Sequence, residues 1–282
     1  MDWRRLFRLL LIAVVPSGCG SGPTAPSASA GAGATTTPVF QLSGDPESVS
    51  GATWIYKATT NGVAYDLQGI LLKPRGQGPF PAVIISHENT RNAGDMLPTA
   101  TEMVAWGLVC IATNYTFAGG VPIGSPGTAA DPGASQANIL RAHKLLDILS
   151  GLAYVDMNRV AAHGNSMGAY VTTAVVGAYP SAFRVASHAA GGVTDPRGPQ
   201  DPAPSPSQAA GIRTPYDIHH GDADITVPLS FDQRLASILD ANGVPYELFV
   251  YPGAGHTNVD PFAQSPIFYA RVRAWYAKYG LF

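Results

Sequence analysis

Apolar residues follow two different periods along this chain. Residues 53–59 and 64–72 alternate between apolar and polar positions, as half-buried strands do, and the Asn61-Gly62 pair between them predicts a hairpin. Short continuous apolar runs predict buried parallel strands over residues 81–86, 108–113, 160–163, 182–190, 215–219 and 246–251. Helical spacing between these runs predicts helices over residues 95–106, 135–149, 167–178, 228–241 and 267–279.

This alternation of strands and helices predicts an α/β fold. Right-handed βαβ connections would give a mostly parallel central sheet with helices on both faces, and ligands bind such sheets beyond the carboxyl ends of the strands. Two irregular segments, 114–132 and 193–212, each follow a strand. They are either walls of a substrate pocket at that edge or ordinary surface loops. No insertion is large enough to predict a separate cap domain.

The start of the chain has the pattern of an export signal. Arginines precede a short apolar stretch over residues 9–15, so we expect a signal peptide over residues 1–19. Cys19 follows a small residue and resembles the lipidated cysteine of bacterial lipoproteins, although Pro16 stands where those motifs usually carry Leu. The alternative is an ordinary signal peptide cleaved elsewhere, for instance after Ala30.

A segment of low complexity follows this signal. Residues 20–38 are almost entirely Ser, Gly, Pro, Ala and Thr and cannot bury enough apolar surface to become ordered. We therefore expect a disordered tether over residues 20–40 and one folded domain over residues 41–282. Cys110 is the second of the two cysteines and lies in an apolar run, so with Cys19 lipidated we expect it to be a buried core residue without a disulfide partner.

Composition limits the classes of partner. Apolar residues make up 46% of the chain and charged residues 13%, which is enough apolar material for a sizeable core. The formal net charge of −2 gives no electrostatic reason to expect binding to nucleic acid or to an anionic membrane surface. Any membrane association would come from the lipid on Cys19. The sequence predicts no particular oligomeric state.

The strongest local signal is Gly164-Asn165-Ser166-Met167-Gly168, which fits the pattern G-x-S-x-G between a predicted strand and a predicted helix. A serine at such a turn has a strained backbone and an exposed hydroxyl, and the helix N-terminus behind it favours a developing oxyanion. The flanking glycines avoid collisions with neighbouring elements. The alternative interpretation is a glycine-rich turn without chemistry.

A serine nucleophile needs a base, and the base needs a carboxylate that orients it. His256 lies on a glycine-rich loop directly after the strand 246–251, which places it at the same edge as Ser166. Two carboxylates, Asp222 and Asp224, lie between these residues in the sequence. The resulting order of Ser, Asp and His is the chain order of α/β-hydrolases.

The remaining histidines do not have the spacing of zinc ligands, and no glycine-rich segment continues into the Gly-Lys-Ser/Thr of a phosphate loop. We therefore expect neither a metal nor another cofactor. The histidines that we interpret as structural are His87, His163, His188, His219 and His220.

From about residue 50 to the end, the chain resembles the α/β-hydrolase superfamily, and within it the branch of dienelactone hydrolases and related esterases. The segment from His220 to Pro228 matches the branch's His-Gly-x-x-Asp-x-x-Val-Pro motif, and this resemblance implies that Asp224 is the acid of the triad. The segment after the third strand, residues 86–89, resembles the oxyanion loop of the family. The resemblance implies that the backbone N–H groups of Asn89 and Met167 bind the oxyanion.

The chain departs from its relatives at the nucleophile. Dienelactone hydrolases use cysteine where this chain has Ser166, which favours general esters over dienelactones as substrates. Glu88 matches a glutamate of those enzymes and either contacts the Ser166 hydroxyl or braces its loop through Arg91 or the backbone. We expect a serine esterase of small-molecule esters. The alternatives are a peptidase, a hydrolase of polymer esters such as feruloyl, acetyl or polyester groups, and a binding module on an idle hydrolase fold.

Overall fold

The computed structural model describes residues 33–195, 201–256 and 265–282. The predicted signal peptide, Cys19 and most of the predicted tether lie outside the described residues. No helix in the described part of the chain is long and apolar enough to cross a membrane.

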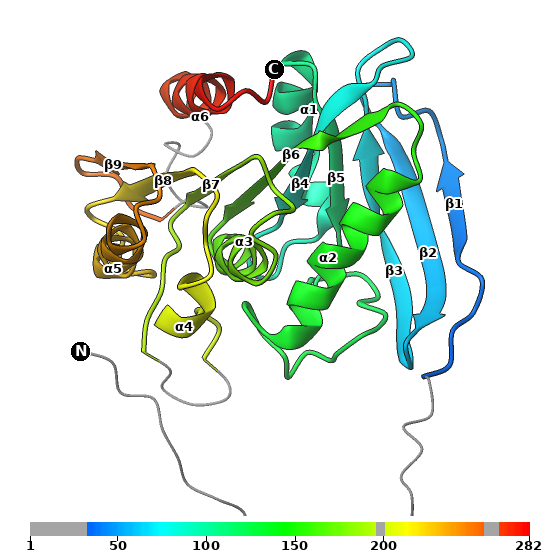
Figure 1. The fold of residues 1–282 in the computed structure, drawn as a ribbon, viewed down its shortest axis with the longest axis horizontal. Coiled ribbons are helices and arrows are strands. Elements are labelled where there is room, and N and C mark those ends of the chain that lie inside the picture. Colours follow the sequence, from blue (N-terminus) through cyan, green and yellow to red (C-terminus); the bar gives the residue numbers. More distant parts are fainter. Residues whose placement is uncertain (1–32, 196–200, 257–264) are drawn as a thin grey trace, which may run out of the picture. The chain divides into compact units, whose positions relative to one another are not determined.

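The strands form one mixed sheet in the order β1-β2-β3-β5-β4-β6-β7-β8-β9 (Figure 1). The pairs from β1 to β5 are antiparallel, and the pairs from β5 to β9 are parallel. The strands are β1 (Val39–Ser43), β2 (Ala52–Thr60), β3 (Val63–Leu72), β4 (Phe80–Ser86), β5 (Val109–Thr113), β6 (Val155–Asn165), β7 (Val185–Ala189), β8 (Tyr216–Gly221) and β9 (Tyr246–Tyr251). The carboxyl ends of β4 to β9 therefore share one edge of the sheet.

Helices cover both faces of this sheet. In Figure 1, α1 and α6 lie on one face, and α2, α3 and α5 lie on the other. Two large apolar clusters correspond to these faces: Met103 of α1 and Val272 of α6 belong to one, and Leu145 of α2, Val171 of α3 and Leu235 of α5 belong to the other. The helices are η1 (Ala93–Met96), α1 (Leu97–Ala105), α2 (Gln136–Ser150), α3 (Met167–Ala178), α4 (Pro206–Ala209), α5 (Leu229–Ala241) and α6 (Pro266–Lys278). This arrangement is the α/β-hydrolase fold, without a large cap among the described residues.

Local sequence accounts for the hairpin between β2 and β3. Asn61 and Gly62 have φ values of 51° and 81°, the left-handed pair that a tight two-residue turn requires. The turn fixes the pairing of Thr60 with Val63. Buried and exposed residues then alternate regularly along β2, as its sequence predicts.

The structure differs from the prediction at the start of the domain. The tether was expected to extend to residue 40, but Val39–Ser43 forms the edge strand β1, and Thr36 donates its N–H to the carbonyl of Thr59. Phe40 of β1 packs against Trp54, with ring centroids 6.2 Å apart. Most residues of β1 are exposed, so the strand lacks the alternating pattern that reveals β2.

Smaller differences concern helix boundaries. The helix predicted over 95–106 is the short 3-10 helix η1 followed by α1, because Pro98 lacks an N–H and fits the first turn of an α-helix. The short helix α4 lies within the segment 193–212, which was predicted to be irregular. Cys110 is a buried free thiol, and burial raises its pKa.

Candidate active site

Three side chains from three strand ends meet at the carboxyl edge of the sheet. Ser166 lies between β6 and α3, Asp224 follows β8, and His256 follows β9. Nε2 of His256 lies 2.7 Å from Oγ of Ser166, and its Nδ1 lies 2.7 Å from Oδ2 of Asp224. The structure thus brings together the three residues that the sequence singled out.

The backbone of Ser166 is strained, as expected of the serine at a G-x-S-x-G turn, but the residue is only 8% exposed and does not have the exposed hydroxyl that the pattern predicts. Its φ and ψ are 54° and −120°, a conformation that L-residues rarely adopt. A Cβ on Gly164 would lie 2.3 Å from the carbonyl oxygen of Gly168, and a Cβ on Gly168 would lie 2.1 Å from that of Ser86. Both glycines are therefore required for the close packing of β6, α3 and the end of β4.

Asp224, and not Asp222, is the carboxylate that contacts His256. Oδ1 of Asp224 accepts the N–H groups of Thr226 and Val227, at 2.8 and 2.9 Å, which leaves Oδ2 for the imidazole. Burial opposes ionisation, but the neighbouring histidines and the two N–H donors hold the pKa of Asp224 below its usual range. Asp222 accepts the N–H of Gly253 and so braces the loop that leads to His256.

The loop after β4 is anchored by His87, which is fully buried. The N–H of Tyr115 donates to Nε2 of His87 at 3.0 Å, so Nδ1 must carry the proton, which it donates to the carbonyl of Glu88 at 2.8 Å. Burial lowers the pKa of His87 to about 4 and keeps the ring neutral. The Glu88 carbonyl also accepts the N–H of Arg91, so this backbone bond contributes to bracing the loop.

The Glu88 carbonyl and the Asn89 N–H belong to the same planar peptide group. His87 therefore fixes the orientation of the N–H for which the family resemblance implies oxyanion binding. Met167 is the first residue of α3, where the N–H has no acceptor within the helix. The approach of Gly168 to the carbonyls of Ser86 and His87 brings this helix N-terminus against the same loop.

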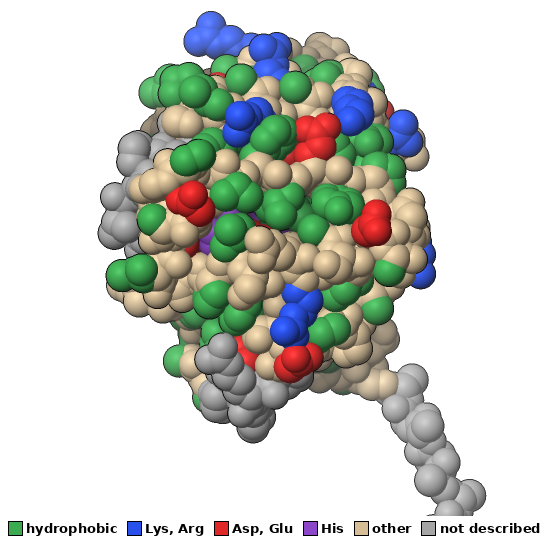
Figure 2. Space-filling view, turned by 90° about the vertical axis from the view of Figure 1, so that its left-hand side faces the viewer, with side chains coloured by type: hydrophobic (Ala, Val, Ile, Leu, Met, Phe, Trp, Pro, Cys, Tyr) green, Lys and Arg blue, Asp and Glu red, His purple; other side chains and the backbone are tan. Residues whose placement is uncertain are grey.

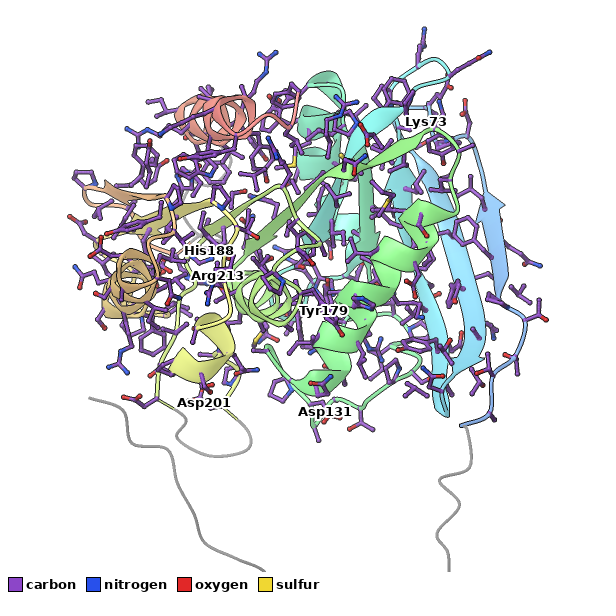
Figure 3. The ribbon with its side chains drawn as sticks, in the orientation of Figure 1. Lys73, Asp131, Tyr179, His188, Asp201 and Arg213 are labelled. Carbon is purple, nitrogen blue, oxygen red and sulfur yellow. The ribbon has the colours of Figure 1, made fainter. Side chains whose placement is uncertain are left out.

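A buried network continues from Asp224 away from Ser166. Nε2 of His220 lies 3.4 Å from Oδ2 of Asp224 and donates to the carbonyl of Val227 at 2.9 Å. Nδ1 of His220 lies 2.6 Å from Oδ2 of Asp232, whose Oδ1 lies 2.7 Å from Nε2 of His188. In Figure 3, His188 lies inside the fold, on the side of the sheet that α3 and α5 cover.

Sequence reasoning did not identify this network. The sequence pattern indicates only structural roles for His188 and His220, and nothing in it singles out Asp232. The available signals were the histidine at the start of the motif His220–Pro228 and an acidic residue on the next helix, α5. Their association depends on how α5 packs against β8, which no local pattern reveals.

The remaining buried histidines form separate contacts. His163 pairs with Ser187, and His219 lies between Asp217 and Tyr251. Six of the seven histidines are buried, and Figure 2 accordingly shows only a small area of histidine on the surface. Acidic and basic groups are scattered over the face that this figure shows. Among the described residues, no group of three or more His, Cys, Asp or Glu side chains could hold a metal ion.

Two loops at this edge of the sheet are tied down by polar contacts. Arg141 is fully buried and donates to the carbonyls of Asn114 and Pro126, which fixes the segment 114–132 on α2. The N–H of Ala134, just beyond this segment, donates to the carbonyl of Pro202 in the second loop. Whether the two loops form the walls of a substrate pocket stays a prediction.

The fold and the arrangement of these residues place the chain among the α/β-hydrolases. A model of the dienelactone hydrolase family matches residues 67–282, so the chain belongs to that family of hydrolases. An uncharacterised protein of Mycobacterium tuberculosis is 29% identical over 195 residues, which cover 64% of this chain and 64% of that protein. The chain thus matches less than two thirds of the length of this relative.

Solved structures with the same fold include esterases and peptidases. Acetyl xylan esterase 1 from Thermoanaerobacterium has a TM-score of 0.62 at 17% identity, covering 87% of this chain and 89% of that one. An S-formylglutathione hydrolase from Agrobacterium tumefaciens has a TM-score of 0.61 at 14% identity, covering 85% and 99%. A puromycin-hydrolysing peptidase from Mycobacterium tuberculosis has a TM-score of 0.61 at 18% identity, covering 86% and 45%. At these identities the likeness concerns the fold alone.

Proposed function

We propose that this protein is a serine hydrolase of carboxylic esters that works through an acyl-enzyme intermediate. The observation that carries the proposal is the unbroken chain of hydrogen bonds from Ser166 through His256 to Asp224. Because the carboxylate of Asp224 accepts the proton of Nδ1, Nε2 of the His256 imidazole is left as an acceptor for the serine hydroxyl. His256 is therefore arranged as a general base.

In the proposed mechanism, Nε2 of His256 takes the hydroxyl proton while Oγ of Ser166 attacks the ester carbonyl. Asp224 stabilises the resulting imidazolium, which then protonates the leaving alcohol. A water molecule attacks the acyl-enzyme by the same steps, releases the acid and returns the proton to Ser166.

The developing oxyanion would be held by the N–H groups of Asn89 and Met167. The orientation of the first is supported by the bond from His87 to the Glu88 carbonyl, and the second lies at the positive end of α3. Such donors act on charge that appears only in the transition state, so they raise kcat more than they lower KM.

Simple esters are the substrate class that we favour. Ser166 occupies the position at which dienelactone hydrolases carry cysteine, and the described residues include no large cap that would select one bulky substrate. A panel of p-nitrophenyl esters of increasing acyl length, acetylated and feruloylated saccharides, a polyester and a peptide p-nitroanilide would separate the candidate reactions. Faster turnover of the peptide amide than of every ester would contradict this proposal.

Replacement of Ser166 by alanine tests the mechanism. We expect Ser166→Ala to lower kcat/KM for p-nitrophenyl acetate by at least about 10⁴-fold and to abolish labelling by a fluorophosphonate probe, with the melting temperature nearly unchanged. Ser237→Ala is a matched control, because Ser237 is an exposed serine on α5 that bonds only its own helix in the structure. Near-normal turnover by Ser166→Ala would refute the assignment.

We also propose that the protein is exported and anchored by a lipid on Cys19. The support is the sequence pattern of an arginine-rich start, an apolar stretch and a small residue before the cysteine. Metabolic labelling with a fatty acid in a bacterial host should mark the wild-type chain and Cys110→Ala but not Cys19→Ser. Equal labelling of all three chains would contradict lipidation at Cys19.

A further inference from the structure

We propose that His220 is a positioning residue for the hydrolytic site, held as a buried cation by Asp232 so that its charge keeps Asp224 ionised and limits the basicity of His256. This inference rests on the proposed function and adds a role for the histidine at the start of the motif His220–Pro228. It concerns a residue that is separated from Ser166 by two other side chains.

The hydrogen-bond partners of His220 identify its protonation state. Its side chain is fully buried, and both ring nitrogens face acceptors: Nε2 faces the Val227 carbonyl and Nδ1 faces the carboxylate of Asp232. A carbonyl oxygen accepts only from an N–H, and an ionised carboxylate does the same. Burial alone would lower the pKa of His220, but Asp224 and Asp232 raise it to about 10, so the ring is an imidazolium at neutral pH.

Asp232 is the counter-ion of this cation. It is fully buried and accepts from His188 as well as from His220, and these two imidazoles hold its pKa below its usual range in spite of its burial. The N–H of Gly191 lies 3.4 Å from its Oδ2. The titratable groups that face His220 are thus Asp224, at the end of β8, and Asp232 on α5, with His188 of β7 behind Asp232.

The charge of His220 bears directly on His256, because both imidazoles contact the same oxygen of Asp224. Nδ1 of His256 lies 2.7 Å and Nε2 of His220 lies 3.4 Å from Oδ2. The two nitrogens are therefore no more than about 6 Å apart, a separation at which like charges repel even with an effective dielectric constant of about 20. The positive charge of His220 therefore opposes a second positive charge on His256, the charge that His256 acquires when it takes the Ser166 proton.

Removal of the cation should make His256 more basic. We expect His220→Gln, which retains an amide donor but no charge, to shift the acidic limb of the kcat/KM profile upward by about one pH unit. Two unit charges at this separation correspond to about two pH units at an effective dielectric constant of about 20, and a shift of about one unit is the lower bound that we expect. Asp232 keeps its charge in this variant and does not offset the effect. A residue that only fills space would not move this limb.

The experiment measures kcat/KM for p-nitrophenyl acetate, and the rate of fluorophosphonate labelling of Ser166, from pH 4.5 to 9. His219→Gln is the matched control, because His219 is the adjacent histidine, is equally buried and also pairs with an aspartate, Asp217. It should lose stability without moving the acidic limb. If the wild-type protein neither hydrolyses the ester nor reacts with the probe, the proposed function fails instead.

A double variant protects the test against loss of folding. His220→Gln leaves Asp232 as a buried charge with one imidazole partner, whereas His220→Gln with Asp232→Asn removes both charges. The double variant should be more stable than His220→Gln, and its acidic limb should shift in the same direction by a smaller amount. An acidic limb within about 0.2 pH units of wild type in an active, folded variant would overturn the inference.

Discussion

Gly168 offers a sharp test of how closely α3 must approach the loop after β4. In a Gly168→Ala variant, the new Cβ would lie 2.1 Å from the carbonyl oxygen of Ser86 and 2.7 Å from that of His87. Both obstacles are backbone atoms, so no rotation of a side chain can relieve the collision. The helix and the loop must instead move apart.

The size of the effect follows from these distances. An ordinary contact between carbon and oxygen needs more than 3 Å, so relief of the closer contact requires a displacement of about 1 Å. Overpacking of this kind costs about 1–3 kcal/mol of unfolding free energy. A shift of about 1 Å in groups that hold the reacting atoms lowers turnover by about 10²-fold. We therefore expect kcat/KM to fall much further than stability alone would suggest.

The assay combines urea unfolding with steady-state hydrolysis of p-nitrophenyl acetate. Gly151→Ala is the control, since its Cβ would lie 3.4 Å from the Ile148 carbonyl oxygen and 4.0 Å from that of Asp147, both ordinary contacts, and its φ of −81° suits alanine. The control should retain both activity and stability. If Gly168→Ala keeps kcat/KM within about threefold of wild type, the tight packing of the loop on α3 is not what positions the oxyanion donors.

Two further predictions concern buried neutral histidines. His87→Leu removes the donor to the Glu88 carbonyl and should lower kcat by about 10²-fold with little change in KM. His87→Asn keeps an amide donor and should retain more activity. A change in KM alone would argue against the role of the peptide group between Glu88 and Asn89. Burial also lowers the pKa of His163 to about 3. As the pH falls, this histidine is therefore protonated in the unfolded chain before it is protonated in the folded protein. The neutral ring contributes fully to stability above about pH 6.5, and this contribution declines at lower pH. Urea unfolding should therefore show wild type losing about 2–3 kcal/mol more than His163→Gln between pH 7.5 and 4.5, and equal losses would contradict this origin of acid sensitivity.

Much of the fold could be predicted because its signals are local. The parallel strands are continuous apolar runs, and α2 has one apolar face, so each element reveals itself within a short window of sequence. The surroundings of Ser166 were predictable for the same reason, since Gly164 and Gly168 are needed where the packing leaves no room for a Cβ. Chain order then indicated His256 but left Asp222 and Asp224 as alternatives, and the resemblance of His220–Pro228 to the family motif selected Asp224.

The features that escaped prediction depend on contacts between distant segments. β1 is an exposed edge strand without alternation, and it is held by its pairing with β2. The partner of His220 is Asp232 on the following helix, and their distance is set by the packing of α5 on the sheet. The constraint on the Asn89 N–H comes from His87, which the Tyr115 backbone holds from another loop. Spacing along the sequence carries none of this information.

The position of β1 has a practical consequence for work with this protein. β1 is at one end of the strand order, five places from β6, which carries Ser166 at its end. Neighbouring strands are spaced by about 4.8 Å, so β1 lies roughly 24 Å across the sheet from β6, the strand that ends at the reactive serine. Because β1 runs antiparallel to β5, its first residue lies at the carboxyl edge, the edge that also holds Ser166. A fusion partner or a solid support attached there would share this edge with the reactive serine, and only the lateral separation would keep it away from substrate.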